Sequence, residues 1–364
     1  MKTIGIYTHI PFCLRKCVYC DFLSDVSENF EMYVRALLNE IKASRPMEGF
    51  QIDTVYIGGG TPTVLPAPLL CEILEAVKEF TLIKGAEITV EANPGALAPE
   101  YLTTLKSQGA NRISIGLQAT HPELLHILGR AHTKEDFTNN FHAAREAGFD
   151  NINIDLMFSL PGQTREHWLD TLQEIIELSP EHISAYSLTP AEGTSLWEQI
   201  KSGGLTLPDD ATDRDMYNTA RRLLTAAGYN HYEISNFAKP NQESLHNINC
   251  WRLKPYIGFG LGAHSFDGRA RWHNTEDMAE YLQYSGKGDA LRKDILLLSA
   301  ADLAAEAMIL GLRLCKGVTE ETASPFKNEV SKLVSDGLLA CGNGRIALTP
   351  YGMDLANRVF AAFL

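Results

Sequence analysis

The sequence predicts an α/β fold: an open, partial (β/α)6 barrel of the TIM type, followed by a C-terminal winged-helix-like module. Six short apolar runs alternate with segments whose apolar residues recur at helical spacing. Such alternation is typical of parallel strands joined by right-handed helical crossovers. Six units are too few for the closed eight-stranded barrel, so the barrel is expected to be open. From residue 299 the alternation gives way to helices and a hairpin.

The six apolar runs are the candidate strands, and they occupy residues 3–9, 53–59, 86–92, 111–118, 151–158 and 182–189. The first crossover helix is expected within 27–44, with Ser27 as its N-cap. Its apolar residues lie on one helical stripe, namely Phe30, Tyr33, Val34, Leu37, Leu38 and Ile41. Later helices of the same kind are expected within 99–109 and 165–178.

Three regions follow from these patterns: a core over 1–195, an extension over 196–298 and a terminal module over 299–364. The extension is rich in Gly, Asn and aromatic residues and is expected to cover one side of the sheet. In the module, Ser299 is a helix cap, and Thr349 followed by Pro350 starts the last helix. Winged-helix modules often bind DNA, but this one carries six basic and seven acidic residues, which favours a structural cap.

Composition and charge exclude several classes of protein. The 364 residues carry a formal net charge of −13, which gives no electrostatic reason to bind nucleic acid or an anionic membrane surface. No stretch approaches the length of a membrane span, and the N-terminus lacks the apolar core of a secretory signal. We therefore expect a cytoplasmic protein. The seven cysteines are unevenly spaced and odd in number, which argues against a disulfide framework.

Three cysteines, Cys13, Cys17 and Cys20, follow the first strand directly with the spacing C-x3-C-x2-C. Thiolates bind zinc or iron–sulfur clusters. One interpretation is structural zinc, with His9 or a distant cysteine as the fourth ligand. The other is a cluster that leaves one iron free, which suits three cysteines on one loop without a second CxxC pair.

Polar and glycine residues gather where the next strands end. GGGTP (58–62) follows the second strand, and its glycines let a ligand approach the backbone closely. A phosphate-binding loop is the rival interpretation, but the Lys-Ser/Thr that should follow is missing. Glu91, Gln118 and Asp155 lie at or near the ends of the third, fourth and fifth strands. A cationic ligand with several hydroxyl groups could compensate these side chains together.

The pattern C-x3-C-x-aromatic-C resembles the signature of the radical S-adenosylmethionine (radical SAM) superfamily. The resemblance implies that Cys13, Cys17 and Cys20 hold a [4Fe–4S] cluster, whose open iron takes the amino and carboxylate groups of S-adenosylmethionine. Reductive cleavage then yields a 5′-deoxyadenosyl radical. It also implies that the Gly-rich segment receives the methionine amino group and that Tyr19 packs near the adenine.

Within that superfamily, the chain resembles the oxygen-independent coproporphyrinogen III oxidase branch over most of its length, including SAYSLTPAEGTSL, YEISNFA and the terminal module. Arg130, in LGRAH after the fourth strand, is a residue that could pair with a substrate carboxylate. The resemblance implies an adenosylmethionine-binding set formed by Tyr7, Tyr19, Gly60, Thr61, Glu91, Gln118, Arg130 and Asp155.

That branch contains oxidases, which decarboxylate two propionates of coproporphyrinogen, and relatives regarded as haem chaperones. Two departures from the oxidases are visible: Phe22 stands where they usually have a fourth cysteine, and only twelve residues precede Cys13. HNINCW (246–251) resembles the HNxxYW motif implicated in haem binding by the chaperones, with Cys250 replacing tyrosine. His246 is then the expected haem ligand. If the stretch is helical, a Cys250 thiolate could supplement it.

The sequence therefore predicts a haem chaperone that uses a [4Fe–4S] cluster and S-adenosylmethionine and passes haem to an acceptor haemoprotein. The alternative is the coproporphyrinogen III oxidase itself; whether the chain is an enzyme stays open, and no catalytic residue is assigned. Expected partners are haem or a porphyrinogen, the acceptor, and a reductant such as flavodoxin or ferredoxin, with no nucleic acid. Peripheral contact with membrane proteins and a homodimer are both compatible with the resemblance.

Overall fold

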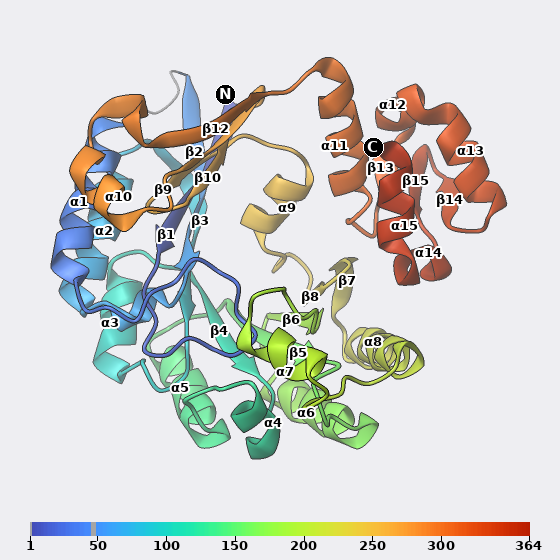
Figure 1. Cartoon of the computed structure of the whole chain (residues 1–364), viewed down its shortest axis with the longest axis horizontal. Helices are drawn as coiled ribbons and strands as arrows, with labels where there is room; N and C mark the ends of the chain where they lie inside the picture. The colour runs from blue at the N-terminus through green and yellow to red at the C-terminus, as the bar shows by residue number, and fades with distance from the viewer. Residues whose placement is uncertain (1, 45–48) are drawn as a thin grey trace.

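The computed structural model describes residues 2–44 and 49–364, and a single curved sheet of twelve strands dominates it (Figure 1). Its centre is six parallel strands in sequence order, which confirms the six predicted strands. Their bounds are β1 Lys2–Ile10, β2 Phe50–Gly59, β3 Leu82–Ala92, β4 Arg112–Gln118, β5 Ile152–Phe158 and β6 His182–Ser187. The sheet does not close on itself, so the barrel is open as predicted.

Helices cover the outer face of these strands (Figure 1). They are α1 Phe30–Ala43, α2 Ala67–Lys78, α3 Pro99–Ser107, α4 Pro122–Ile127, α5 Lys134–Glu146 and α6 Arg165–Leu178. The predicted stripe on α1 is confirmed, since Tyr33, Val34 and Leu37 are buried. The prediction of Ser27 as the cap is wrong. The N-cap position is Asn29, because the helix begins where Phe30 packs edge-on against Phe12, with ring centroids 5.0 Å apart.

The segment 196–298 was expected to cover one side of the sheet. In the structure it adds strands to the sheet at both edges. After α7 Ser195–Lys201 and α8 Asp210–Ala226, it adds β7 Asn230–Glu233 and β8 Asn236–Ala238 beside β6. Beyond α9 Leu245–Trp251, it adds β9 Tyr256–Phe259 parallel to β1, then β10 His264–Phe266, β11 Ala270–Asn274 and β12 Arg292–Leu297, with α10 Met278–Tyr284 between the last two. The short α9 thus lies between strands that extend opposite edges (Figure 1).

The C-terminal module combines helices with a small antiparallel sheet. Its elements are α11 Ala300–Gly311, β13 Val318–Thr319, α12 Glu320–Ala323, α13 Lys327–Ser335, β14 Leu339–Gly342, β15 Arg345–Leu348, α14 Pro350–Asp354 and α15 Ala356–Phe360. Ser299 caps α11 with a full capping box, and Thr349 caps α14, as predicted. The final helix, expected to be continuous, is interrupted at Leu355. The module has its own hydrophobic cluster, separate from that of the barrel.

The inner face of the barrel is polar, and this positions the site. Successive strand residues point to opposite faces, so the buried isoleucines and valines of β2 and β3 face the helices while alternate residues face inward. The inward set includes Tyr56, Glu87, Glu91 and Arg112, all of them polar. Among the described residues no helix is both long and apolar enough to cross a membrane.

Candidate active site at the strand ends

The three-cysteine loop leaves the carboxyl end of β1 and is closed by backbone hydrogen bonds. The Cys13 amide donates to the Asp25 carbonyl over 2.9 Å, and the Asp25 amide donates to the Pro11 carbonyl over 2.6 Å. Between them, Phe12 is fully buried and anchors the loop on α1. Since both ends of the loop are pinned, its thiols are held over the strand ends.

A cavity of about 430 Å³ lies at this place, and its lining includes all three thiols. Each cysteine is free and partly exposed. Six of the residues expected to bind S-adenosylmethionine also line the cavity: Tyr19, Gly60, Glu91, Gln118, Arg130 and Asp155. Four different strands and the cysteine loop therefore converge on one cavity, because the carboxyl ends of parallel strands meet at the same edge.

Two members of the expected set lie outside this cavity. Thr61 lines an adjoining small hollow together with Cys17 and Arg130, and its hydroxyl lies 3.7 Å from the Cys13 sulfur. Tyr7 stands behind the cavity wall, where its ring stacks on Tyr56 with centroids 6.3 Å apart. Thr61 is thus adjacent to the thiols, whereas Tyr7 contacts the cavity through a neighbour.

The glycines form a cradle that a side chain would fill. A Cβ atom added to Gly60 would stand 2.6 Å from the Phe12 carbonyl oxygen and 3.0 Å from the Cys13 sulfur. One added to Gly58 would stand 2.7 Å from Glu91 Oε2. Together with three free thiols on one wall, this cradle fits a [4Fe–4S] cluster and a ligand that approaches the backbone closely.

Two buried carboxyl groups face the cavity. Glu91 accepts hydrogen bonds from the Tyr56 hydroxyl at 2.7 Å and from the Gly59 amide at 3.1 Å. Burial raises the pKa of Glu91 to about 7, and the neighbouring Asp155 contributes to the rise. Asp155 accepts from Ser114 at 3.0 Å, and burial raises its pKa as well. A cationic ligand in the cavity would stabilise the ionised form of both carboxyl groups.

Arg130 connects the cysteine loop to two strands. Its guanidinium donates to the Cys17 sulfur at 3.5 Å and to the Gly116 carbonyl at 2.6 Å, and it also bonds the Asn93 side chain. Asn93 in turn donates to the Thr61 hydroxyl at 2.6 Å. Among the described residues the Nε atom of Arg130 is buried and has no partner, so one donor remains for a ligand.

The zinc interpretation named His9 or a distant cysteine as the fourth ligand, and the contacts of His9 argue against the first of these. His9 uses both ring nitrogens: Nδ1 is 2.9 Å from the Tyr7 hydroxyl, and Nε2 is 2.8 Å from the Leu23 carbonyl. Within residues 2–44 and 49–364, no three His, Cys, Asp or Glu side chains converge on a point suited to one metal ion. The thiolates of an iron–sulfur cluster bind different irons and need not converge in this way.

His246 lies on α9, outside the cavity and on the other side of Tyr56. Its side chain is 6% exposed, its Nδ1 is 2.9 Å from the Thr54 hydroxyl, and its ring lies 5.1 Å from the Tyr56 ring. Burial lowers the pKa of His246 to about 4, so the imidazole is neutral at physiological pH. The expected helix around Cys250 is present, but burial raises the pKa of this thiol to about 11.

A carboxylate holds the first turn of α9. Glu87 on β3 accepts hydrogen bonds from the backbone amides of Leu245, at 2.8 Å, and of His246, at 3.0 Å. Farther along the helix, Asn249 donates to Asp53 at 3.2 Å. The helix is thus attached to the polar inner face of β2 and β3.

Sequence reasoning missed several residues that line the cavity: Tyr56, Asn93, Ser114 and Tyr186. Two of them could have been found from the alternation of side chains along a strand, in which every second residue lies on the same face. Tyr56 precedes Gly58 by two residues, and Asn93 follows Glu91 by two, so each continues the face of a residue near the strand end.

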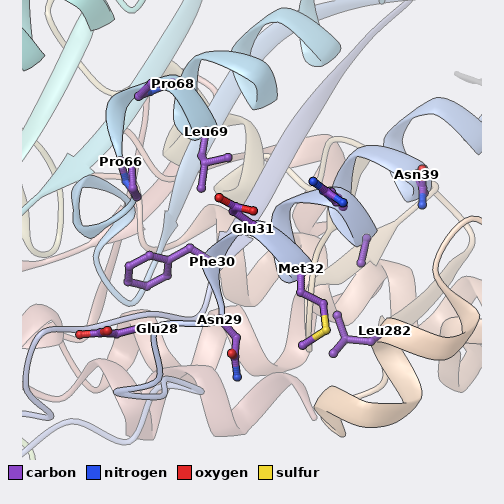
Figure 2. Close-up of a pocket in the computed structure, with 12 residues that line it drawn as sticks. Glu28, Asn29, Phe30, Glu31, Met32, Asn39, Pro66, Pro68, Leu69 and Leu282 are labelled. Atoms are coloured by element: carbon purple, nitrogen blue, oxygen red, sulfur yellow. The ribbon is translucent and has the colours of Figure 1, made fainter.

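A larger hollow, of about 910 Å³, lies elsewhere, on the outer surface between α1, α2 and α10 (Figure 2). Exposed Glu31 and Met32 line it together with Pro66 and Pro68 at the start of α2. None of the expected site residues lies in its wall. The smaller strand-end cavity is therefore the candidate site, because the expected cofactor-binding residues line it and not the larger hollow.

Comparisons with known proteins identify the family of the chain. Residues 7–175 match the family model of the radical SAM superfamily, and residues 298–355 match that of the HemN C-terminal domain. The chain is 36% identical to the heme chaperone HemW of Lactococcus lactis, over 100% of this chain and 98% of that protein. Identity to the heme chaperone HemW of Bacillus subtilis is 35%, over 98% of both chains.

The heme chaperone HemW of Escherichia coli is 40% identical over 72% of this chain and 70% of that protein. Among solved structures, coproporphyrinogen III oxidase (HemN) of Escherichia coli, described as a radical SAM enzyme, superposes with a TM-score of 0.85. The superposition covers 100% of this chain and 90% of that one, at 24% identity, which establishes the shared fold.

Proposed function

Because this chain belongs to the HemW family of radical SAM proteins, we propose that it is a haem chaperone that binds haem and transfers it to an acceptor haemoprotein. The observation that carries the proposal is the place of the haem-motif helix. α9 is held on the inner face of the barrel by Glu87 and Thr54, and His246 lies directly against Tyr56 of the cofactor cavity. The motif and the cofactor site are thus neighbours.

As a radical SAM protein, the chain takes a [4Fe–4S] cluster and S-adenosylmethionine. We assign the cluster to Cys13, Cys17 and Cys20, and the nucleoside to the cavity residues around Glu91 and Asp155. When bound, the cluster supplies the electron for reductive chemistry on the sulfonium, and a small electron carrier such as flavodoxin or ferredoxin supplies it in turn. The chain's own residues bind and orient these groups and exclude water from them.

His246 is proposed as the axial ligand of haem iron. Its imidazole is neutral at physiological pH, which is the form that binds a metal. With α9 in its packed position the Thr54 hydroxyl engages Nδ1 of His246, and this contact is lost when the ring becomes accessible to haem. Because the ring is 6% exposed, haem binding requires α9 to move away from β2 and β3.

The two candidate functions are separated by one pair of experiments on the anaerobically reconstituted protein. In the first, haem titration is followed by absorption for the wild type, His246→Ala and, as a control, a variant of the exposed His264, His264→Ala. We expect only His246→Ala to lose the axial-ligand spectrum. Release of the bound haem to an apo-haemoprotein then tests transfer.

The second experiment incubates the protein with coproporphyrinogen III, S-adenosylmethionine and reductant. A vinyl product without tight haem binding would overturn the chaperone proposal in favour of the oxidase. Iron and acid-labile sulfide analysis of the same sample tests the cluster: a zinc-filled site without sulfide would remove it. We also propose a cytoplasmic location, and sedimentation with and without cofactors would decide between a monomer and a homodimer.

A further inference from the structure

Two hydrogen-bond donors outside the cysteine loop reach two of its sulfur atoms. The Arg130 guanidinium donates to the Cys17 sulfur at 3.5 Å. The Thr61 hydroxyl lies 3.7 Å from the Cys13 sulfur, which is within hydrogen-bond reach of so large an acceptor atom. The side chain of Asn93 contacts both donors, so a single amide joins the two groups that face the sulfurs.

The contacts of Asn93 fix which end of its amide faces which donor. An arginine side chain has donors only, so the amide oxygen faces Arg130, and this bond measures 2.5 Å. The amide nitrogen then faces the Thr61 hydroxyl and donates to it at 2.6 Å. Gly116 confines the arrangement, because its carbonyl accepts from the same guanidinium nitrogen at 2.6 Å, and an added Cβ atom would stand 2.9 Å from the Asn93 oxygen.

The direction of the Thr61 hydroxyl follows from the direction of this amide. The hydroxyl oxygen accepts the proton of Asn93, so the hydroxyl's own proton points elsewhere. The Cys13 sulfur is the acceptor that lies within its reach. A cysteine that binds a metal is a thiolate and can only accept, so the sequence of donors runs from Asn93 through Thr61 to Cys13.

We propose that Asn93 is a positioning residue that directs the donors of Arg130 and Thr61 at the sulfur ligands of the [4Fe–4S] cluster and so raises its reduction potential. This inference rests on the proposed assignment of the cluster to the three-cysteine loop. Hydrogen bonds to the sulfurs stabilise the reduced cluster more than the oxidised one, because the reduced cluster carries one more negative charge. A small electron carrier can then reduce the cluster more easily.

Asn93→Asp tests the direction of these bonds at nearly constant side-chain volume. An aspartate beside Arg130 is ionised and has acceptors only, so it takes the Thr61 proton and removes that donor from Cys13. The charge of the aspartate also lowers the potential directly. Thr61→Val separates the two effects, because valine has no proton to redirect.

The measurement is a redox titration followed by EPR, on reconstituted protein without S-adenosylmethionine. In Thr61→Val the ratio of reduced to oxidised cluster at a fixed potential is expected to fall about three- to ten-fold, the effect of one lost hydrogen bond. Thr61→Ser keeps the hydroxyl and should match the wild type. Asn93→Asp should lower the potential more in the wild-type background than in Thr61→Val. Asn218→Asp, the same change on the exposed surface of α8, is the control and should leave the potential unchanged.

Iron and acid-labile sulfide content separates this inference from the assignment on which it rests. A wild-type protein without sulfide overturns the cluster assignment itself. With the cluster present, an unchanged potential in Asn93→Asp or in Thr61→Val overturns the role of Asn93 while the assignment stands. A shift of equal size from Asn93→Asp in both backgrounds does the same. Each single variant is also compared with the wild type alone, so either one decides if the other does not retain its cluster.

Discussion

The Tyr56 hydroxyl donates a hydrogen bond of 2.7 Å to Glu91. The two residues come from neighbouring strands. The Tyr56 ring also lies near the His246 ring, with the two centroids 5.1 Å apart. One side chain therefore contacts both the carboxylate that faces the cofactor cavity and the expected haem ligand. Any movement of Tyr56 on ligand binding is transmitted to both.

Tyr56→Phe is expected to weaken S-adenosylmethionine binding about five- to ten-fold at pH 7, the value of one lost hydrogen bond. Without that bond the pKa of Glu91 rises further, so less of the charged carboxylate is available to a cationic ligand. Calorimetry on anaerobically reconstituted protein measures the affinity. Tyr281→Phe is the matched control, because it removes a 2.6 Å bond to the buried Glu40, and neither residue lines the cavity. Equal affinity in both variants would refute the expectation.

Gly60→Ala is expected to lower cluster affinity by roughly 10–100-fold, as changes next to metal ligands do. The added methyl would meet the Phe12 carbonyl and the Cys13 sulfur at 2.6 Å and 3.0 Å, so the loop must shift. Iron and acid-labile sulfide per chain, with an EPR spectrum of the reduced protein, are the measurements. Gly342→Ala is the control, since nothing lies within 4 Å of its added methyl. A normal cluster content in Gly60→Ala would contradict the expectation that the cluster needs a glycine at position 60.

Stability is expected to fall as pH rises from about 5 to 8, in part through Glu40. Burial raises the pKa of Glu40 from 4.5 to about 7. The folded state thus holds a proton that the unfolded chain has lost, and this stabilisation is complete below about pH 4.5 and disappears as pH passes 7. The contribution is at most about 3 kcal/mol.

Urea unfolding at several pH values measures this slope. Glu40→Gln is expected to flatten it, whereas Glu100→Gln, on the exposed surface of α3, is expected to leave it unchanged. Some slope should persist in Glu40→Gln, because the pKa of Glu91 is raised in the same direction. An unflattened slope in Glu40→Gln would exclude Glu40 as a source.

Glu87→Gln is expected to release the start of α9. The carboxylate accepts hydrogen bonds from the Leu245 and His246 amides, and bonds to a charged group contribute about 1.5–3 kcal/mol. These two amide protons should exchange with solvent about ten-fold faster or more in the variant. Hydrogen exchange measured by NMR tests this, with the amides of β4 as the internal control. Exchange at the wild-type rate would show that α9 is held by other contacts.

If haem binding requires α9 to leave the sheet, the same variant should also bind haem faster. Stopped-flow absorption on wild type and Glu87→Gln gives the two association rates. A slower rate in the variant would indicate that haem binds α9 in its present position.

The central strands, the α1 stripe and the Ser299 and Thr349 caps were predictable because each depends on residues near one another in the chain. The convergence of Cys13, Gly60 and Glu91 was also predictable, since parallel strands end at one edge and the family motif marks the residues. The start of α1 was not, because it depends on Phe30 packing against Phe12.

By itself the sequence determined the six central strands, the three-thiol loop and the haem motif, because period, spacing and local composition encode them. Only the tertiary structure decided that Thr54 meets His246 across 192 positions of the chain, that Glu87 holds α9 and that Arg313 covers Trp251. Such contacts join segments that are distant in the chain. They form only when the sheet extends past both edges and packs α9 between the barrel and the C-terminal module.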